Sequence, residues 1–237
     1  MANFETHFKA SVVTSAAVCS VMLAASLTAP TEALLLFVIG SLAGLLPDLD
    51  ADKSRSLNSL FSLFALCIGI CLPIIIKFSS LSAIWVCALA VYLAFMYILK
   101  PLFESFTIHR GASHSLLCVV MVALLSVNLA LLAGKAMNTA LLLSVSVSVG
   151  MLTHLILDEC YSVDMNNNKI KASFGSALKP IAINSPIASL LQLAVIVVCI
   201  YALKDHYHAL ENTVTGWQLQ LTKLPLLPES DVLQRWL

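Results

Sequence analysis

The amino-acid sequence predicts an all-α fold, a polytopic bundle of about seven membrane helices. Hydrophobic residues account for 59% of the 237 residues and charged residues for only 11%, and the mean hydropathy is +0.93. These values lie outside the range of ordinary soluble domains. Apolar runs recur along most of the chain, and each is long enough to cross, or nearly cross, a hydrocarbon core of about 30 Å. We therefore expect a multi-pass membrane protein.

Seven stretches are expected to form the membrane segments, because short stretches that contain Pro, Asn, Ser or charge separate them. They are residues 10–28, 33–46, 58–76, 81–99, 114–133, 138–157 and 185–203. The second stretch is short because Pro47 follows it, so we expect it to be tilted or only partly inserted. The first stretch has some features of a secretory signal peptide, but no small-residue cleavage site follows it and the remainder would still be polytopic. We expect one helical domain over 1–204 and a C-terminal tail over 205–237.

Basic side chains are distributed unequally between the two expected ends of the bundle. If the N-terminus and the loops at 47–57, 100–113 and 158–184 share one face, that face carries most of the lysines and arginines near the membrane. The positive-inside rule then places the N-terminus and this face in the cytoplasm, and the tail outside. The 13 basic and 13 acidic residues balance, so nothing predicts nucleic-acid binding. The expected partner is the lipid bilayer, and the sequence does not specify an oligomeric state.

Histidine and aspartate side chains at membrane depth are the main functional signal, because ionisable groups there are costly and rare. Under the topology above, seven of them share the cytoplasmic face: His7, Asp48, Asp50, His109, His114, His154 and Asp158. Taken separately, each group has an ordinary explanation. A polar loop would explain His109 and His114. A solvated turn would explain Asp48 and Asp50, and a hydrogen-bonded structural histidine would explain His154. Their occurrence on one face favours a metal site instead.

The spacing and chemistry of these residues indicate divalent metal ions. His154 and Asp158 lie four residues apart, so on a helix they project from one face. Asp48, Asp50 and Asp158 are expected at helix C-terminal ends, where the helix dipole disfavours a carboxylate by about 0.3–1 kcal/mol and a cation would compensate. Mixed His and Asp ligation suits Zn²⁺, Mn²⁺ or Fe²⁺ better than Ca²⁺. Seven candidate ligands exceed the needs of one ion, so we expect two ions bridged by a carboxylate such as Asp50 or Asp158.

Residues beside these candidate ligands are expected to bind phosphate. The guanidinium of Arg110 suits a bidentate phosphate contact, although a cytoplasmic membrane anchor explains this residue equally well. The N-terminus of the segment at 114–133, with Ser113 and Ser115 as caps, is expected to offer backbone N–H groups to an anion. The residues expected to act in catalysis are Asp50, Asp158 and Arg110.

Four short motifs carry the seven candidate ligands. They are Thr6-His7, Leu46-Pro47-Asp48-Leu49-Asp50, His109-Arg110-Gly111-Ala112-Ser113-His114-Ser115 and His154-Leu155-Ile156-Leu157-Asp158. In this order they resemble the YdjM-type inner-membrane metal-dependent hydrolases of bacteria, a family also labelled LexA-binding. The resemblance covers about residues 3–180 and implies metal ligation by the seven His and Asp residues. It also implies a helical core similar to the zinc-dependent phospholipase C and P1 nuclease group, which cleaves phosphoesters. The pair Cys160-Tyr161 departs from the Leu-Thr pair of many members.

Three classes of function are consistent with these features. The first is a membrane-embedded hydrolase that cleaves a phosphoester, in a phospholipid or another substrate, at the cytoplasmic face with metal-activated water. The second is a metal-stabilised scaffold or regulatory partner protein without catalysis, which would have saturated coordination. The third, a transporter, is disfavoured because four of the seven segments have no ionisable residue in their middle. We expect the hydrolase.

Overall fold

The structure is a computed structural model that describes residues 4–50, 55–75, 78–101, 112–164, 169–170, 175 and 178–224. Helices dominate these residues. Their only strands are two-residue β1 (Val163–Asp164) and β2 (Lys169–Ile170), which pair antiparallel. The predicted all-α helical bundle is confirmed.

The helices occur in the order of the expected membrane segments. They are α1 (Phe4–Ala24), α2 (Pro30–Ala43), α3 (Arg55–Ile75), α4 (Leu81–Ala94), α6 (Leu116–Leu132), α7 (Met137–Tyr161), α8 (Pro186–Ala202) and α9 (Tyr207–Thr222). Three short segments of other helix types accompany them. They are the 3-10 helices η1 (Leu46–Asp50) and η3 (Lys204–His206) and the π-helical η2 (Phe95–Leu99). The residues from 207 to 222, expected to belong to a tail, thus form a helix.

Among the described residues, four or five helical stretches are long and apolar enough to cross a membrane, whereas seven membrane segments were expected. Four helical stretches are long and apolar enough to cross a membrane: Phe4–Ala24, Pro30–Asp48, Leu81–Leu99 and Met137–Tyr161. A fifth span results if α8 and the following helix, bent by 44° at their junction, count as one. Helix α6 has 17 residues and therefore rises only about 25 Å, less than the hydrocarbon core of about 30 Å.

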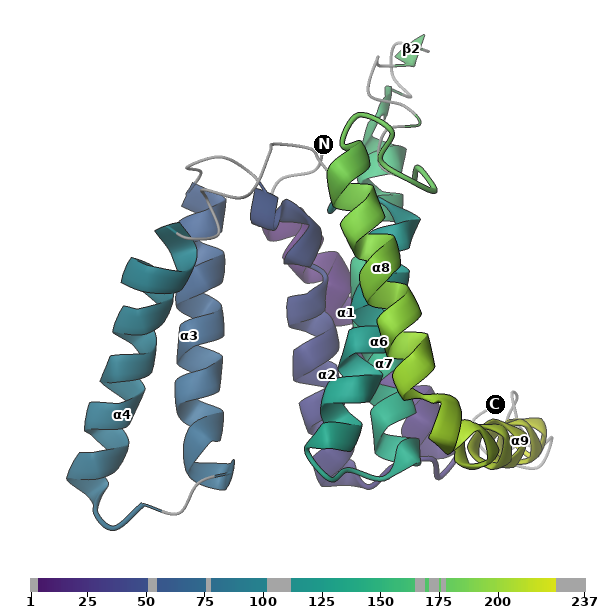
Figure 1. Ribbon diagram of the computed structural model, residues 1–237, viewed down its shortest axis with the longest axis horizontal. Helices are drawn as coiled ribbons and strands as arrows, with labels where there is room; N and C mark the ends of the chain where they lie inside the picture. The colour runs from purple at the N-terminus through teal and green to yellow at the C-terminus, as the bar shows by residue number, and fades with distance from the viewer. Residues whose placement is uncertain are drawn as a thin grey trace, which may run out of the picture.

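Helix α7 lies at the centre of the main bundle, in contact with α1, α2 and α6, while α8 packs on the outer side of α6 (Figure 1). The α3–α4 hairpin stands beside this bundle and meets it at η1. Helix α9 packs against α7 through Trp217, whose Nε1 donates a 2.7 Å hydrogen bond to Asn138 Oδ1. The Asn138 amide in turn donates to the Leu27 carbonyl oxygen at 2.8 Å. These contacts hold the end of the bundle that is opposite η1.

Small residues at four-residue spacing allow α1, α2 and α7 to approach one another closely. This small-residue interface consists of Ser11, Ser15, Gly40, Gly44, Ser146 and Gly150. A Cβ atom at Gly150 would overlap the carbonyl oxygen of Gly40, and one at Gly44 would overlap Ser11 Oγ. Membrane helices come this close only where side chains are small, and van der Waals packing then stabilises the contact.

Replacing Gly150 by Ala should therefore destabilise the bundle by about 1–3 kcal/mol, because the added methyl group forces α2 and α7 apart. Unfolding of the purified protein in detergent, followed by circular dichroism during denaturant titration, would measure this loss. Gly216→Ala is a matched control, since a Cβ atom there meets nothing within 4 Å, and its stability should equal or slightly exceed that of the wild type. Equal stability of Gly150→Ala and wild type would contradict the close packing.

Candidate metal centre

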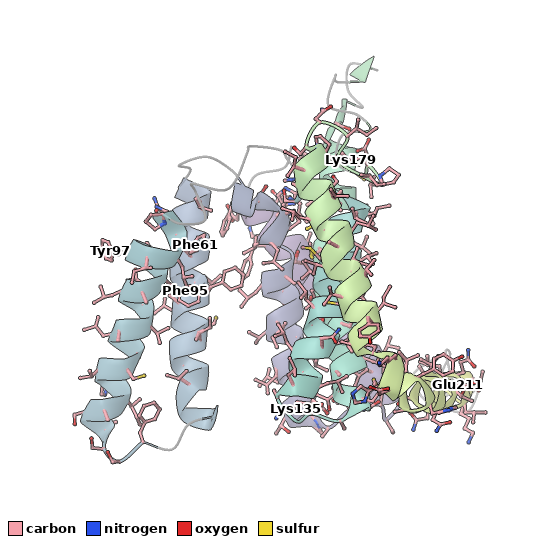
Figure 2. All side chains as sticks on the ribbon, viewed as in Figure 1. Phe61, Phe95, Tyr97, Lys135, Lys179 and Glu211 are labelled. Carbon is pink, nitrogen blue, oxygen red and sulfur yellow. The ribbon has the colours of Figure 1, made fainter. Side chains whose placement is uncertain are left out.

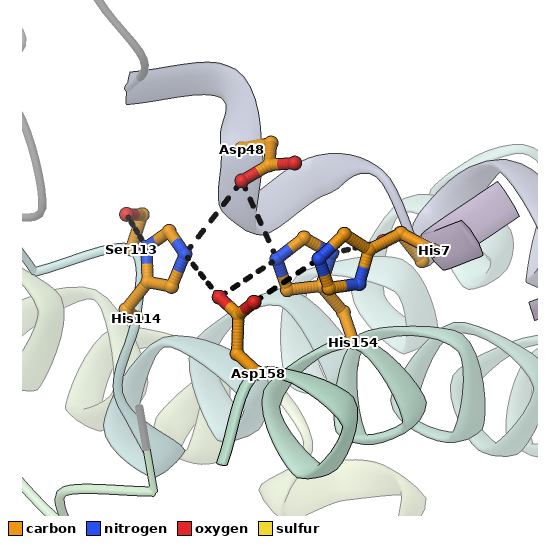
Figure 3. Close-up of polar contacts among 7 residues, drawn as sticks. His7, Asp48, Ser113, His114, His154 and Asp158 are labelled. Atoms are coloured by element: carbon orange, nitrogen blue, oxygen red, sulfur yellow. Dashed lines mark hydrogen bonds and ion pairs between the residues drawn. The ribbon is translucent and has the colours of Figure 1, made fainter. Parts of the chain in front are cut away.

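Five of the seven predicted ligands lie together at one end of the main bundle (Figure 3). This His/Asp cluster consists of His7, Asp48, His114, His154 and Asp158. Its histidines and Asp158 are at most 4% exposed, and the side chain of Asp48 is 16% exposed. The side chain of Asp50 and the residues His109 and Arg110 lie outside the described residues.

The small-residue interface explains why three of these side chains meet. His7 precedes Ser11 by four residues, Asp48 follows Gly44 by four, and His154 follows Gly150 by four. Because residues four apart share a helix face, the contact on α1 and α7 continues directly to His7 and His154. Asp48 joins them from η1, which follows the end of α2. His7 was expected to precede the first helix, but it lies within α1, which begins at Phe4. The helical phase of α1 therefore aims this histidine at the cluster.

Several donor atoms of the cluster lie as close together as the ligands of a metal ion. Nε2 of His154 lies 3.4 Å from Asp48 Oδ1 and 3.8 Å from Asp158 Oδ2. Nε2 of His114 lies 3.8 Å from Asp48 Oδ1 and 3.7 Å from Asp158 Oδ2. These separations exceed ordinary hydrogen bonds. Ligands of tetrahedral Zn²⁺, each about 2.1 Å from the metal, lie about 3.4 Å from one another. The cluster can therefore hold a metal ion.

The hydrogen bond of His154 fixes which of its nitrogens faces the carboxylates. Nδ1 lies 2.7 Å from the Gly44 carbonyl oxygen, and because a carbonyl only accepts, Nδ1 carries the proton. In the neutral ring, Nε2 then presents a lone pair toward Asp48 and Asp158. This buried nitrogen makes no hydrogen bond to the part of the chain that the structure describes. A lone pair that faces two carboxylates requires a cation or a proton between them. Metal-binding histidines typically donate the N–H of their other ring nitrogen to a carbonyl or carboxylate, as Nδ1 of His154 does here.

His7 contacts the cluster in a different way. Its Nε2 lies 3.1 Å from Asp158 Oδ1, and its ring stacks on His154 with centroids 3.8 Å apart. Asp158 thus binds His7 through one oxygen and turns the other toward His114 and His154. This arrangement favours His7 as the residue that orients Asp158, although its ring also lies within ligand distance of Asp48 and His154.

The described donors form a site for one ion. Two groups of three residues have metal-like geometry: His7, Asp48 and His154, and His114, His154 and Asp158. They share His154, whose Nδ1 already binds Gly44, and a single remaining nitrogen binds a single metal ion. The expectation of two ions therefore depends on Asp50 and His109 and stays a prediction.

The turn that carries His114 does not bind an anion in the way expected from the sequence. The backbone N–H groups of Leu116 and Leu117 donate to the carbonyl oxygens of Lys179 and Pro180, at 3.0 and 3.1 Å. Ser115 caps α6 by accepting from the Cys118 N–H at 3.2 Å, as predicted. The expected phosphate site at this helix N-terminus is wrong, because protein acceptors already occupy its amides. Ser113, the other expected cap, contacts His114 Nδ1 at 3.1 Å instead.

One residue near the cluster was missed in the sequence. Gln192 in α8 donates a 3.0 Å hydrogen bond from Nε2 to the carbonyl oxygen of Ala112, two residues before His114. It is the one amide side chain between Pro186 and Ala202. An isolated amide within an apolar helix is a signal that would have identified it, because buried polar groups in a membrane need partners.

A family model described as YdjM inner membrane protein matches residues 1–209. The chain belongs to this family. The match includes every member of the His/Asp cluster, and with the apolar helices it identifies a multi-pass protein of the inner membrane. The YdjM resemblance of the four motifs is thereby confirmed. No curated protein and no solved structure is detectably similar to the chain, and the expected similarity of this YdjM protein to the phospholipase C and P1 nuclease group stays a prediction.

We expect the purified protein to bind at least one Zn²⁺ per chain, because the described donors form two overlapping groups of three with metal-like spacing. His154→Ala should abolish stoichiometric binding, since it removes the donor shared by both groups. Elemental analysis by mass spectrometry would count the metal. His208→Ala, a change at an exposed histidine of α9, is the control and should bind like the wild type. Wild-type protein without stoichiometric metal, or full binding by His154→Ala, would contradict the site.

Proposed function

We propose that the protein is a metal-dependent hydrolase that cleaves a phosphoester at the cytoplasmic face of the membrane. The observation that carries this proposal is the buried His/Asp cluster, in which two overlapping groups of three donors have metal-like spacing. A bound Zn²⁺ or Mn²⁺ would make water acidic enough to supply hydroxide near neutral pH and would polarise a phosphoryl oxygen. Soluble Zn²⁺ sites of mixed His and Asp ligands commonly support such hydrolysis.

The chain's own residues contribute three actions. The Gly44 carbonyl holds His154 in the tautomer that ligates through Nε2. His7 orients Asp158 through a 3.1 Å contact, and this His–Asp pair is the proposed acceptor for a proton released from water. Asp48 is the most exposed member of the cluster, so water and substrate would approach on its side. Asp50 as a bridging or catalytic carboxylate and Arg110 as a phosphate ligand remain predictions for residues that the structure does not describe.

A phospholipid or another membrane-associated phosphoester is the proposed substrate class. The cluster lies at the end of the bundle rather than at its middle (Figure 1), which is where lipid phosphate groups are found. The 158–184 loop, which is expected on the same face as the cluster, contains Lys169, Lys171 and Lys179. These lysines would attract anionic lipid headgroups.

A structural metal centre is the second candidate function, and burial of the cluster favours it. Four donors would complete a tetrahedral coordination sphere and leave no position for water. In that case, removal of the metal would unfold the protein, and no substrate would be turned over. Asp48 has the most exposed side chain of the cluster. In a hydrolase, its displacement from the metal would free a coordination position for water or substrate.

Hydrolysis of a short-chain phosphatidylcholine and of bis-p-nitrophenyl phosphate by the metal-loaded protein in detergent would test the proposal. Asp158→Asn should lower turnover by about 100-fold or more, because it removes both a ligand and the proposed proton acceptor. His208→Ala should retain full activity, and circular dichroism would verify that both variants fold. Absence of turnover by the wild type, together with unfolding after chelation, would instead support the structural centre.

We also propose that the cluster faces the cytoplasm, because most basic residues lie at its end of the bundle. Lys179 and Lys135 mark the two ends (Figure 2). The exposed Cys160 is two residues from Asp158, so a membrane-impermeant maleimide should label it only after spheroplasts are lysed. A cysteine introduced at Lys135 should react in intact spheroplasts. The reverse pattern would place the site on the outer side of the membrane.

A further inference from the structure

Helix α8 contains one buried amide, Gln192, which is 8% exposed. It lies on the buried stripe of this helix with Ser189, Ile196 and Cys199. Helix propensity does not require a glutamine here, and an amide buried at membrane depth is unfavourable unless it forms hydrogen bonds. Its presence therefore calls for a specific partner.

The partner is the carbonyl oxygen of Ala112, at 3.0 Å from Nε2 of Gln192. The same oxygen accepts a 2.7 Å hydrogen bond from Ser115 Oγ. A carbonyl has two lone pairs, so these two bonds use its full accepting capacity. Gln192 reaches Ala112 from α8, whereas Ser115 reaches it from within the turn, and together they fix the backbone on both sides of His114.

His114 differs from the other members of the cluster in how it is placed. His7, Asp48, His154 and Asp158 belong to α1, η1 and α7, which meet at or beside the small-residue interface. His114 comes from the turn before α6, and α8 packs chiefly against α6. Packing of α6 on α7 places the helix that follows His114, but the turn itself is held through the Ala112 carbonyl.

We propose that Gln192 is the positioning residue of His114: its hydrogen bond to Ala112 places the His114 imidazole within ligand distance of the two aspartates. The inference rests on the metal role of the cluster in the proposed function. Metal ligands must be held within a few tenths of an ångström. Loss of the Gln192 amide removes one of the two hydrogen bonds to the Ala112 carbonyl. The turn that carries His114 would then be less firmly held, and the affinity of the cluster for a metal ion would fall.

The test compares Gln192→Met with Asn128→Leu in the full-length protein. Methionine keeps the length of glutamine but cannot donate. Asn128 is a matched control, because its amide also joins α6 to α8, through the Cys199 carbonyl oxygen at 3.4 Å, but about 20 Å along α6 from His114. Competition with a chromophoric chelator would measure zinc affinity. We expect a loss of about 10-fold to 100-fold in Gln192→Met, as for other residues that orient metal ligands, and none in Asn128→Leu.

A second measurement needs no metal. Diethyl pyrocarbonate modifies accessible histidines, and mass spectrometry of peptides would give the rate at each site in the metal-free protein. His114 is 4% exposed in the wild type, and His7 and His154 are fully buried. Gln192→Met should raise the modification rate of His114 several-fold while His7 and His154 stay protected. Asn128→Leu should leave all three rates unchanged.

The outcomes separate this inference from the proposed function. Unchanged labelling of His114 in Gln192→Met, or equal changes in both variants, would overturn the positioning role. Faster labelling of His114 and weaker zinc binding in Gln192→Met alone would support it, even if the wild type hydrolysed no phosphoester, a result that would overturn the hydrolase instead. A wild type that bound no zinc would overturn both proposals.

Discussion

The close approach of three helix backbones is the constraint on which the rest of the structure depends. Gly150 lies directly against the backbone of Gly40 and Gly44, and on the other side only the small side chains of Ser11 and Ser15 separate α2 from α1. In a bilayer, where apolar residues gain nothing by leaving lipid for protein, such contacts are among the few forces that hold helices in a fixed register. The register matters here because the cluster begins one helical turn beyond the contact. Successive residues of an α-helix point about 100° apart. A shift of one residue in the helix register would therefore turn the ligand away from the other members of the cluster.

The two halves of the site consequently have different physical origins. The residues on α1, η1 and α7 are positioned by close packing at the small-residue interface, which tolerates little change in volume. The contacts of His154 with Gly44 and of His7 with Asp158 then set the orientation of their side chains. The turn that carries His114 is held by the packing of α6 on α7 and by hydrogen bonds, from Gln192 to Ala112 and from the α6 amides to Lys179 and Pro180. Such bonds are directional and individually modest. The part held by hydrogen bonds is therefore the one in which small rearrangements are energetically accessible.

Much of the helical fold could be predicted because apolar runs in the sequence mark the membrane helices directly. Helix α1 begins six residues before its expected segment, since helix continues through polar residues at the membrane surface. Helix α9 was expected to be a tail because its sequence is polar, and only the docking of Trp217 on the bundle explains its position. The positions of His7, Asp48, His114, His154 and Asp158 at one end followed from topology alone. Their division into ligands and orienting residues did not, because it depends on contacts such as His154 with Gly44 and Gln192 with Ala112, between residues 80 to 110 positions apart.

The composition of the cluster has an electrostatic consequence. Two carboxylates with three uncharged imidazoles carry a net charge of minus two, which one divalent cation neutralises and a monovalent cation does not. In a medium of low polarity, an uncompensated charge is strongly unfavourable. For the five described members of the cluster, a divalent ion would therefore be the electroneutral occupant of the buried site.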